Sequence, residues 1–106
     1  TLVTDPNGTT YSTIPVNATV KIASNTQYIV NSTQSFVYYV QVKQFSGQVE
    51  FIGKYEGVFL GPGDQSVSVN WIPHSAGSYF IETYVWNYDS VPLSSAEPSI
   101  NVVLVK

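Results

Sequence analysis

Apolar and polar residues alternate along much of this chain. Residues 35–43 read S-F-V-Y-Y-V-Q-V-K, and residues 66–72 read S-V-S-V-N-W-I. In each stretch every second side chain is apolar, which is the spacing of a β-strand that turns one face to a core. The pattern predicts two strands, with Phe36, Tyr38, Val40 and Val42 on the core face of the first and Val67, Val69 and Trp71 on that of the second.

Five further segments are rich in β-branched and aromatic residues and are also predicted to be strands: 17–23, 27–31, 48–55, 78–87 and 99–105. The alternation breaks just before Gly53, which predicts a bulge or bend there. In the last segment it predicts that Ile100, Val102 and Leu104 face the core. Short strands at roughly ten-residue spacing, separated by turns such as Gly61-Pro62-Gly63-Asp64, predict an all-β antiparallel sandwich of about seven strands.

The segment 78–87 is apolar on both faces. One face carries Tyr79, Ile81, Thr83 and Val85, and the other carries Phe80, Tyr84 and Trp86 around Glu82. A strand of an antiparallel sandwich normally turns one face to water. We therefore expect the second face to meet a neighbouring domain, another subunit or a carbohydrate. The alternative is that its aromatic rings are simply half-exposed on the sheet.

The composition narrows the function classes. Charged residues make up 10% of the 106 residues, whereas 43% are hydrophobic and 14% aromatic, so the chain can bury a core and is not disordered. Four lysines, no arginine and a net charge of -3 exclude the basic stripe that nucleic-acid binding requires. No apolar run is long enough to predict a transmembrane segment, and the first twenty residues do not read as a signal peptide. We expect a mature, processed product or an excised domain.

The polar surface is predicted to be mostly uncharged. The chain has 13 Ser, 9 Thr and 7 Asn, and it has no cysteine. The missing cysteines exclude structural disulfides but do not indicate a compartment. Because uncharged hydrogen-bonding groups replace the charges of a typical cytosolic protein, we expect an extracellular, cell-surface location.

Residues 60–87 carry a resemblance to a known group of domains. They are similar to the second half of immunoglobulin-like and fibronectin-like modules of prokaryotic surface proteins, and to the CARDB-type adhesion-related domains of archaeal and bacterial exported proteins in particular. Those domains join an L-x-P-G turn to a V-x-V-x-W strand and then G-x-Y-x-I. The matching positions are Leu60, Pro62, Gly63, Trp71, Gly77, Tyr79 and Ile81.

The resemblance covers about residues 17–105. It implies an immunoglobulin-like β-sandwich in which the hydroxyl of Tyr79 caps a backbone group at a turn. The acid- and asparagine-rich ending usual in that family is missing, and residues 87–94 stand in its place. A fold of this kind hosts many functions, so the resemblance by itself does not identify one.

Enzyme chemistry is not expected. His74 is the one histidine, it lies in a predicted turn, and no cysteine is available as a nucleophile. The four glutamates lie on different predicted elements without a motif. Asp64 and Asp89 lack the alternating acidic spacing of a calcium loop. We predict no catalytic residue, no metal site and no cofactor.

Three sequons offer a more specific signal. Asn7, Asn17 and Asn31 each begin an N-x-[S/T] triplet without proline at its middle position. All three lie in the first third of the chain, at predicted turns or strand ends that a glycosyltransferase could reach. The sequence predicts N-glycosylation of at least one of them in an exported protein.

Residues 1–16 precede the sandwich predicted for residues 17–106. They carry five apolar residues without an obvious partner: Leu2, Val3, Tyr11, Ile14 and Val16. This arm is either a first strand folded back on its own sandwich or a strand donated to the next subunit. Donation would fill a sheet edge in trans and build a head-to-tail homopolymer. Several archaeal and bacterial surface filaments resemble that arrangement.

Two function hypotheses follow. The first is a non-enzymatic structural or adhesive protein, a glycosylated subunit of a pilus-like or thread-like filament of an archaeal-type cell surface. The alternative is a carbohydrate-binding module in which Phe80, Tyr84 and Trp86 form a platform for sugar rings. An accessory domain of a larger secreted protein is not separable from the first hypothesis by sequence.

Overall fold

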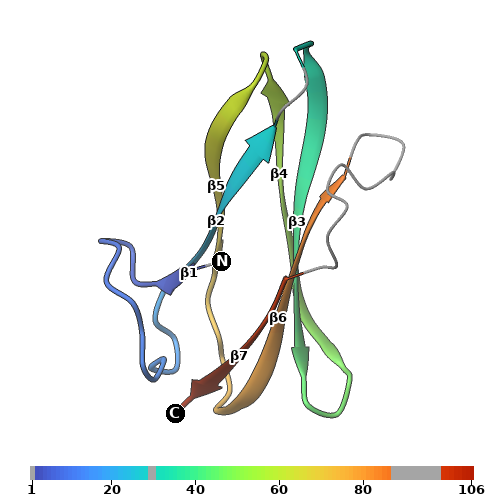
Figure 1. Ribbon diagram of the computed structural model, residues 1–106. Coiled ribbons are helices and arrows are strands. Elements are labelled where there is room, and N and C mark those ends of the chain that lie inside the picture. Colours follow the sequence, from blue (N-terminus) through green and yellow to red (C-terminus); the bar gives the residue numbers. More distant parts are fainter. Residues whose placement is uncertain (1, 29–30, 87–98) are drawn as a thin grey trace.

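Seven strands form two facing antiparallel sheets in the computed structural model, which describes residues 2–28, 31–86 and 99–106 (Figure 1). The strands are β1 (Leu2–Thr4), β2 (Val20–Tyr28), β3 (Gln34–Gln44), β4 (Val49–Phe59), β5 (Gly63–Trp71), β6 (Gly77–Trp86) and β7 (Ser99–Val105). One sheet has the order β1-β2-β5 and the other the order β4-β3-β6-β7. The described residues contain no helix. The predicted all-β, immunoglobulin-like sandwich is confirmed.

The core lies between the two sheets. Phe36, Tyr38, Val40 and Val42 of β3 are fully buried, as their alternation predicts. Val20, Ile22, Val67 and Trp71 oppose them from the three-stranded sheet. The hydroxyl of Tyr38 lies 2.7 Å from the hydroxyl of Ser24 on β2, so this buried phenol is satisfied across the core. Burial raises the pKa of Tyr38, against a smaller effect of the Ser24 hydrogen bond.

Two predicted strand boundaries are wrong. Residues 17–23 and 27–31 are not separate strands, because β2 runs without interruption from Val20 to Tyr28 along β5. The irregularity in β4 is a bulge at Glu50. Val42 of β3 pairs with Phe51 and the next residue, Lys43, pairs with Val49, so Glu50 has no partner residue on β3. Gly53 instead pairs regularly with Val40, and β4 continues to Phe59.

Glycines on the core side of β4 make room for aromatic rings. The strand alternates Phe51, Gly53, Tyr55, Gly57 and Phe59 on this side. A Cβ atom on Gly57 would lie 2.7 Å from the Phe36 ring, and one on Gly53 would lie 2.8 Å from the ring of Phe51. The Phe36 ring in turn stacks on Phe59 with centroids 4.2 Å apart. Gly53 and Gly57 are therefore packing positions.

The predicted orientation of β7 is also wrong. Ile100, Val102 and Leu104 are exposed by 60%, 61% and 40%, whereas Val105 is buried. The register with β6 explains the inversion, because Tyr79 pairs with Val103 and Ile81 pairs with Asn101. Cross-strand partners share a face of the sheet, so the core-facing residues of β6 turn the odd-numbered residues of β7 inward.

The N-terminal arm lies along the edges of both sheets of its own chain. Leu2–Thr4 pairs with residues 21–23 of β2. Ile14 forms a parallel bridge to Val105, and its N–H donates to the Leu104 carbonyl at 2.9 Å. Val3 and Ile14 are buried in the core, Tyr11 and Val16 pack against it, and Leu2 is exposed. This placement corresponds to the alternative of a folded-back first strand; donation to a second copy stays a prediction.

Candidate binding surface on the four-stranded sheet

The surface of the four-stranded sheet that faces away from the core is strongly apolar. On β6, alternation with the buried residues Tyr79, Ile81 and Thr83 turns the even-numbered side chains to this side. We call this surface the outer face, and its described residues are Val37, Tyr39, Gln41 and Lys43 of β3, Ile52, Lys54, Glu56 and Val58 of β4, Phe80, Glu82, Tyr84 and Trp86 of β6, and Ile100, Val102 and Leu104 of β7.

Three aromatic rings meet on the outer face and form what we call the aromatic cluster: Tyr39, Tyr84 and Trp86. The centroids of Tyr39 and Trp86 lie 4.9 Å apart, and those of Tyr84 and Trp86 lie 5.2 Å apart. Tyr39 and Tyr84 are direct cross-strand partners. All three side chains are half-buried, so each ring is fixed by its neighbours and still reaches solvent.

A second aromatic pair lies further along β6. Phe80 stacks on Phe45, which follows the end of β3, with centroids 4.4 Å apart and an interplanar angle of 14°. Phe45 is exposed and Phe80 is half-buried. The outer face therefore carries aromatic surface towards both ends of β6.

A polar network separates the two aromatic groups. The phenol of Tyr84 donates a hydrogen bond to the carboxylate of Glu82, and the ammonium of Lys43 lies 3.2 Å from the same carboxylate. The Tyr84 hydrogen bond and, after it, Lys43 lower the pKa of Glu82, while partial burial opposes them. Donation to Glu82 raises the pKa of Tyr84 to about 12. Glu82 is held as a carboxylate with its position fixed by two partners.

The structure brings the predicted residues Phe80, Tyr84 and Trp86 onto one surface and adds partners that sequence reasoning missed. Tyr39 and Lys43 come from β3, and Phe45 comes from the hairpin after it. The alternation of residues 35–43 already places Tyr39 on the side away from the core, and this pattern was the sequence signal for its position on the outer face. Its contact with Trp86 depends on the pairing of β3 with β6, which the sequence pattern does not specify.

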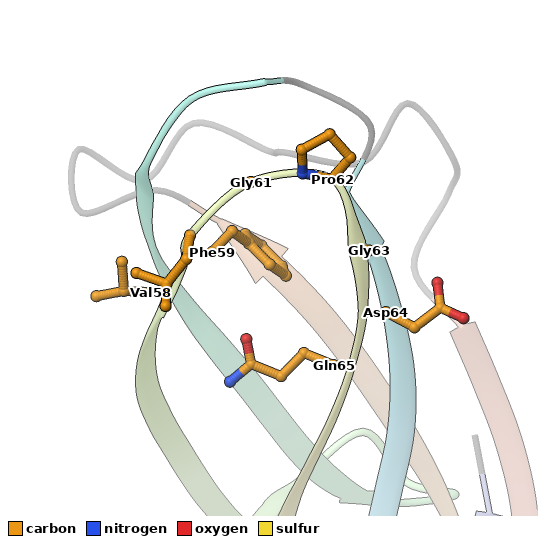
Figure 2. A pocket seen from close by; sticks show the side chains of 8 residues that line it. Val58, Phe59, Gly61, Pro62, Gly63, Asp64 and Gln65 are labelled. Atoms are coloured by element: carbon orange, nitrogen blue, oxygen red, sulfur yellow. The ribbon is translucent and has the colours of Figure 1, made fainter.

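A pocket of about 490 Å³ lies under the turn between β4 and β5 (Figure 2). Its lining is formed by residues 58–65, which include the Gly61-Pro62-Gly63 turn. Figure 2 shows Phe59 and Gln65 under the arch of this turn, while Asp64 points away from it. The lining holds two polar side chains, Asp64 and Gln65, and Asp64 points away from the arch, so the pocket offers less specific chemistry than the outer face.

The sequon asparagines are all exposed in the structure: Asn7, Asn17 and Asn31. Asn17 has a left-handed backbone with φ of 66°, and its side-chain oxygen lies 3.2 Å from Nδ1 of His74. The amide oxygen makes this contact. The amide nitrogen, to which an N-linked glycan would be attached, does not take part in it. In the other turn, the N–H groups of Asn7 and Thr9 both donate to a carboxylate oxygen of Asp5, each at 2.9 Å.

The motif residues of the resemblance have packing and turn roles. The phenol of Tyr79 donates to the carbonyl of Ser75 at 2.8 Å, which is the contact that the resemblance implies. The ring of Trp71 packs edge-on against Tyr79 at 5.3 Å. Gly77 has a φ of 149° where the chain enters β6. These three residues therefore hold the corner between β5 and β6.

Metal and membrane features were sought over residues 2–28, 31–86 and 99–106. In that part of the chain, no three acidic or histidine side chains come together in a way that could hold a metal ion. None of it forms a helix with the length and apolarity needed to cross a membrane.

Comparison with known proteins identifies the fold but no family. No family model matches the sequence, and no curated protein matches it. The C-terminal domain of Wzt superposes with a TM-score of 0.72 at 8% identity, covering 98% of this chain and 69% of that one. The CARDB domain of a Pyrococcus furiosus protein, solved in complex with di-metal ions, superposes with a TM-score of 0.62 at 19% identity, covering 89% and 79%. The chain therefore has a CARDB-like, immunoglobulin-like fold, as the sequence resemblance predicts.

Proposed function

We propose that this chain is a non-catalytic, extracellular accessory module whose outer face binds carbohydrate. The aromatic cluster is the observation that carries this proposal. Tyr39 of β3 and Tyr84 and Trp86 of β6 bring three contacting rings, tilted at 49° to 55° to one another, onto the side of the sheet that faces away from the core. The immunoglobulin-like fold of the two structural neighbours is consistent with an accessory or binding domain.

Sugar rings suit this surface physically. A pyranose has an apolar C–H face that stacks on aromatic rings and a rim of hydroxyls that needs directed hydrogen-bond partners. The cluster supplies the ring surface, and Glu82 and Lys43 supply an acceptor and a donor beside it. Because the rings already pack against one another, little side-chain freedom is lost on binding.

The electrostatics of Glu82 favour binding over hydrolysis. A carboxylic acid that protonates a glycosidic oxygen needs a raised pKa. Tyr84 and Lys43 lower the pKa of Glu82, so it is ionised at neutral pH and serves as an acceptor for sugar hydroxyls. A module that holds a glycan without cleaving it is therefore the function that we infer.

Affinity electrophoresis through gels that contain neutral polysaccharides tests the proposal. We expect retardation by at least one neutral glycan, and we expect Trp86→Ala to weaken binding about tenfold or more because stacking area is lost. Ile72→Ala is the matched control and should leave binding unchanged, since Ile72 is an exposed apolar residue that follows β5 and lies outside the outer face. Equal retardation of the wild type and a folded Trp86→Ala variant, or no retardation by any glycan, would overturn the proposal.

A glycosylated filament subunit is the second candidate. The observation that favours it is that the N-terminal arm pairs with an edge of each sheet: Leu2–Thr4 pairs with β2, and Ile14 pairs with β7. The arm of a neighbouring copy could make the same two pairings and join subunits head to tail. Exposure of Asn7, Asn17 and Asn31 is compatible with glycans on such a filament.

Negative-stain microscopy and intact-mass measurement of protein from its native source test this second candidate. Filaments and a mass that falls when N-glycans are removed enzymatically are the expected results. Separate particles would remove the filament, and a mass unchanged by deglycosylation would remove the glycans.

A further inference from the structure

The outward edge of β7 is able to accept another strand. The Leu104 carbonyl accepts from Ile14, and the N–H of Lys106 donates to Ile14 at 3.0 Å, so both residues direct backbone groups away from β6. Alternate residues of a strand direct these groups to the same side. The backbone N–H and carbonyl groups of Ile100 and Val102 therefore point to this edge as well. Among the residues that the structure describes, none pairs with them there.

Each of the other three sheet edges carries a feature that discourages strand addition. The strand β1 has only three residues, and its Val3 carbonyl already accepts a hydrogen bond from the N–H of Tyr11. On β4, at the opposite edge of the same sheet, Lys54 and Glu56 form an ion pair at 3.3 Å and a bulge interrupts the strand at Glu50. On β5 the outward side chains are Ser66, Ser68 and Asn70, with Asp64 near the start. By contrast, β7 contains no charged residue, no proline and no bulge in its pairing with β6.

We propose that β7 is a homodimer interface in which two copies pair antiparallel, edge to edge, and join their four-stranded sheets into one. The partner is a second copy because the strand is complementary to itself. With no charge between residues 99 and 105, antiparallel pairing opposes no like charges, and it places the two Lys106 residues at opposite ends. A two-fold axis midway between Ile100 and Val102 would set Ile100 of each strand beside Val102 of the other.

The pairing would cover apolar surface that otherwise faces water. Ile100 and Val102 are 60% and 61% exposed, and each would gain a cross-strand apolar neighbour on the outer face. The bridge at Ile14 limits the interface to the part of β7 that precedes Leu104. Such an interface is isologous and closes after two copies. It does not depend on what the outer face binds.

Analytical ultracentrifugation from micromolar to millimolar concentration tests this inference. The wild type is expected to form a species of twice 11.6 kDa. Val102→Lys adds a charge beside the edge, and Val102→Pro removes an N–H that faces away from β6, so each should weaken dimerisation about tenfold or more. Ile52→Lys is the control, because Ile52 is 63% exposed against 61% for Val102 and lies on the opposite edge strand. It should leave the dimer intact.

Three results would overturn the inference. They are a wild type that stays monomeric over the whole range, a folded Val102→Lys variant that dimerises as well as Ile52→Lys, and an assembly larger than a dimer that Val102→Lys leaves unchanged. Circular dichroism establishes the folding of each variant. If Val102→Pro fails to fold, Val102→Lys and Ile52→Lys still decide the outcome.

Discussion

The phenol of Tyr84 donates a hydrogen bond to the carboxylate of Glu82, two residues earlier on the same face of β6. Lys43 of the neighbouring strand reaches the same carboxylate. This arrangement fixes the orientation of Tyr84 next to Trp86, so the polar network also positions the aromatic cluster. The aromatic cluster of the candidate surface is thus held by contacts between strands.

The network gives the stability of the fold a defined pH dependence. The pKa of Glu82 in the folded protein lies below its ordinary value of 4.5. The ionised carboxylate therefore stabilises the fold above pH 4.5, and this stabilisation is lost as the pH falls through the folded-state pKa. The pKa of Tyr84 is raised from 10.0 to about 12, so its contribution is present below pH 10 and is lost as the pH rises through 12. We expect Tyr84→Phe to raise the pKa of Glu82, measured by NMR titration of its carboxyl carbon. An unchanged Glu82 pKa would show that Tyr84 does not set it.

The corner between β5 and β6 should depend on one hydroxyl. Tyr79→Phe removes the donor to the Ser75 carbonyl and leaves the ring against Trp71. We expect a loss of about 1 kcal/mol in the free energy of unfolding, measured by urea denaturation. Tyr55→Phe is the comparison, because Tyr55 is 40% exposed and water can reach its side chain. Equal effects of the two substitutions would argue against a special role for the corner.

The glycine positions of β4 should not tolerate a methyl group. In Gly57→Ala the new Cβ would meet the Phe36 ring at 2.7 Å and the Tyr55 ring at 2.9 Å. Phe36 is fully buried and stacked on Phe59, so it has little room to move. We expect destabilisation of about 1–3 kcal/mol by thermal or urea unfolding. Val58→Ala, on the exposed side of the same strand, should change stability by less; a neutral Gly57→Ala would contradict the packing role.

Strands β3 and β6 could be predicted from sequence because each has a continuous apolar alternation on the core side. Phe36 to Val42 and Tyr79 to Thr83 are buried as their spacing predicts. The same rule failed for β7. Its alternation favours Ile100, Val102 and Leu104 as the core face, but the register with β6 places Asn101, Val103 and Val105 on the core side. The larger apolar residues of β7 lie outward, which reflects a tertiary constraint and not a local preference.

The candidate surface could be predicted only in part, for a related reason. Phe80, Tyr84 and Trp86 belong to one strand, so a period of two is enough to place them together. Tyr39 and Lys43 join them through the register of β3 against β6, which the core packing fixes. Likewise, the sequence marks Gly53 as an irregularity, but only the three-dimensional packing identifies it as the space occupied by the Phe51 ring.

NMR chemical-shift mapping with neutral oligosaccharides is the decisive test of carbohydrate binding by the outer face. We expect the backbone amide signals of the aromatic cluster and of Glu82 and Lys43, and the ring signals of the cluster, to shift together and to saturate with one affinity. We also expect signals of the turn pocket, from Val58 to Gln65, to stay in place. Shifts confined to that pocket, or no shifts with any neutral oligosaccharide, would contradict the assignment of the outer face as a carbohydrate-binding surface.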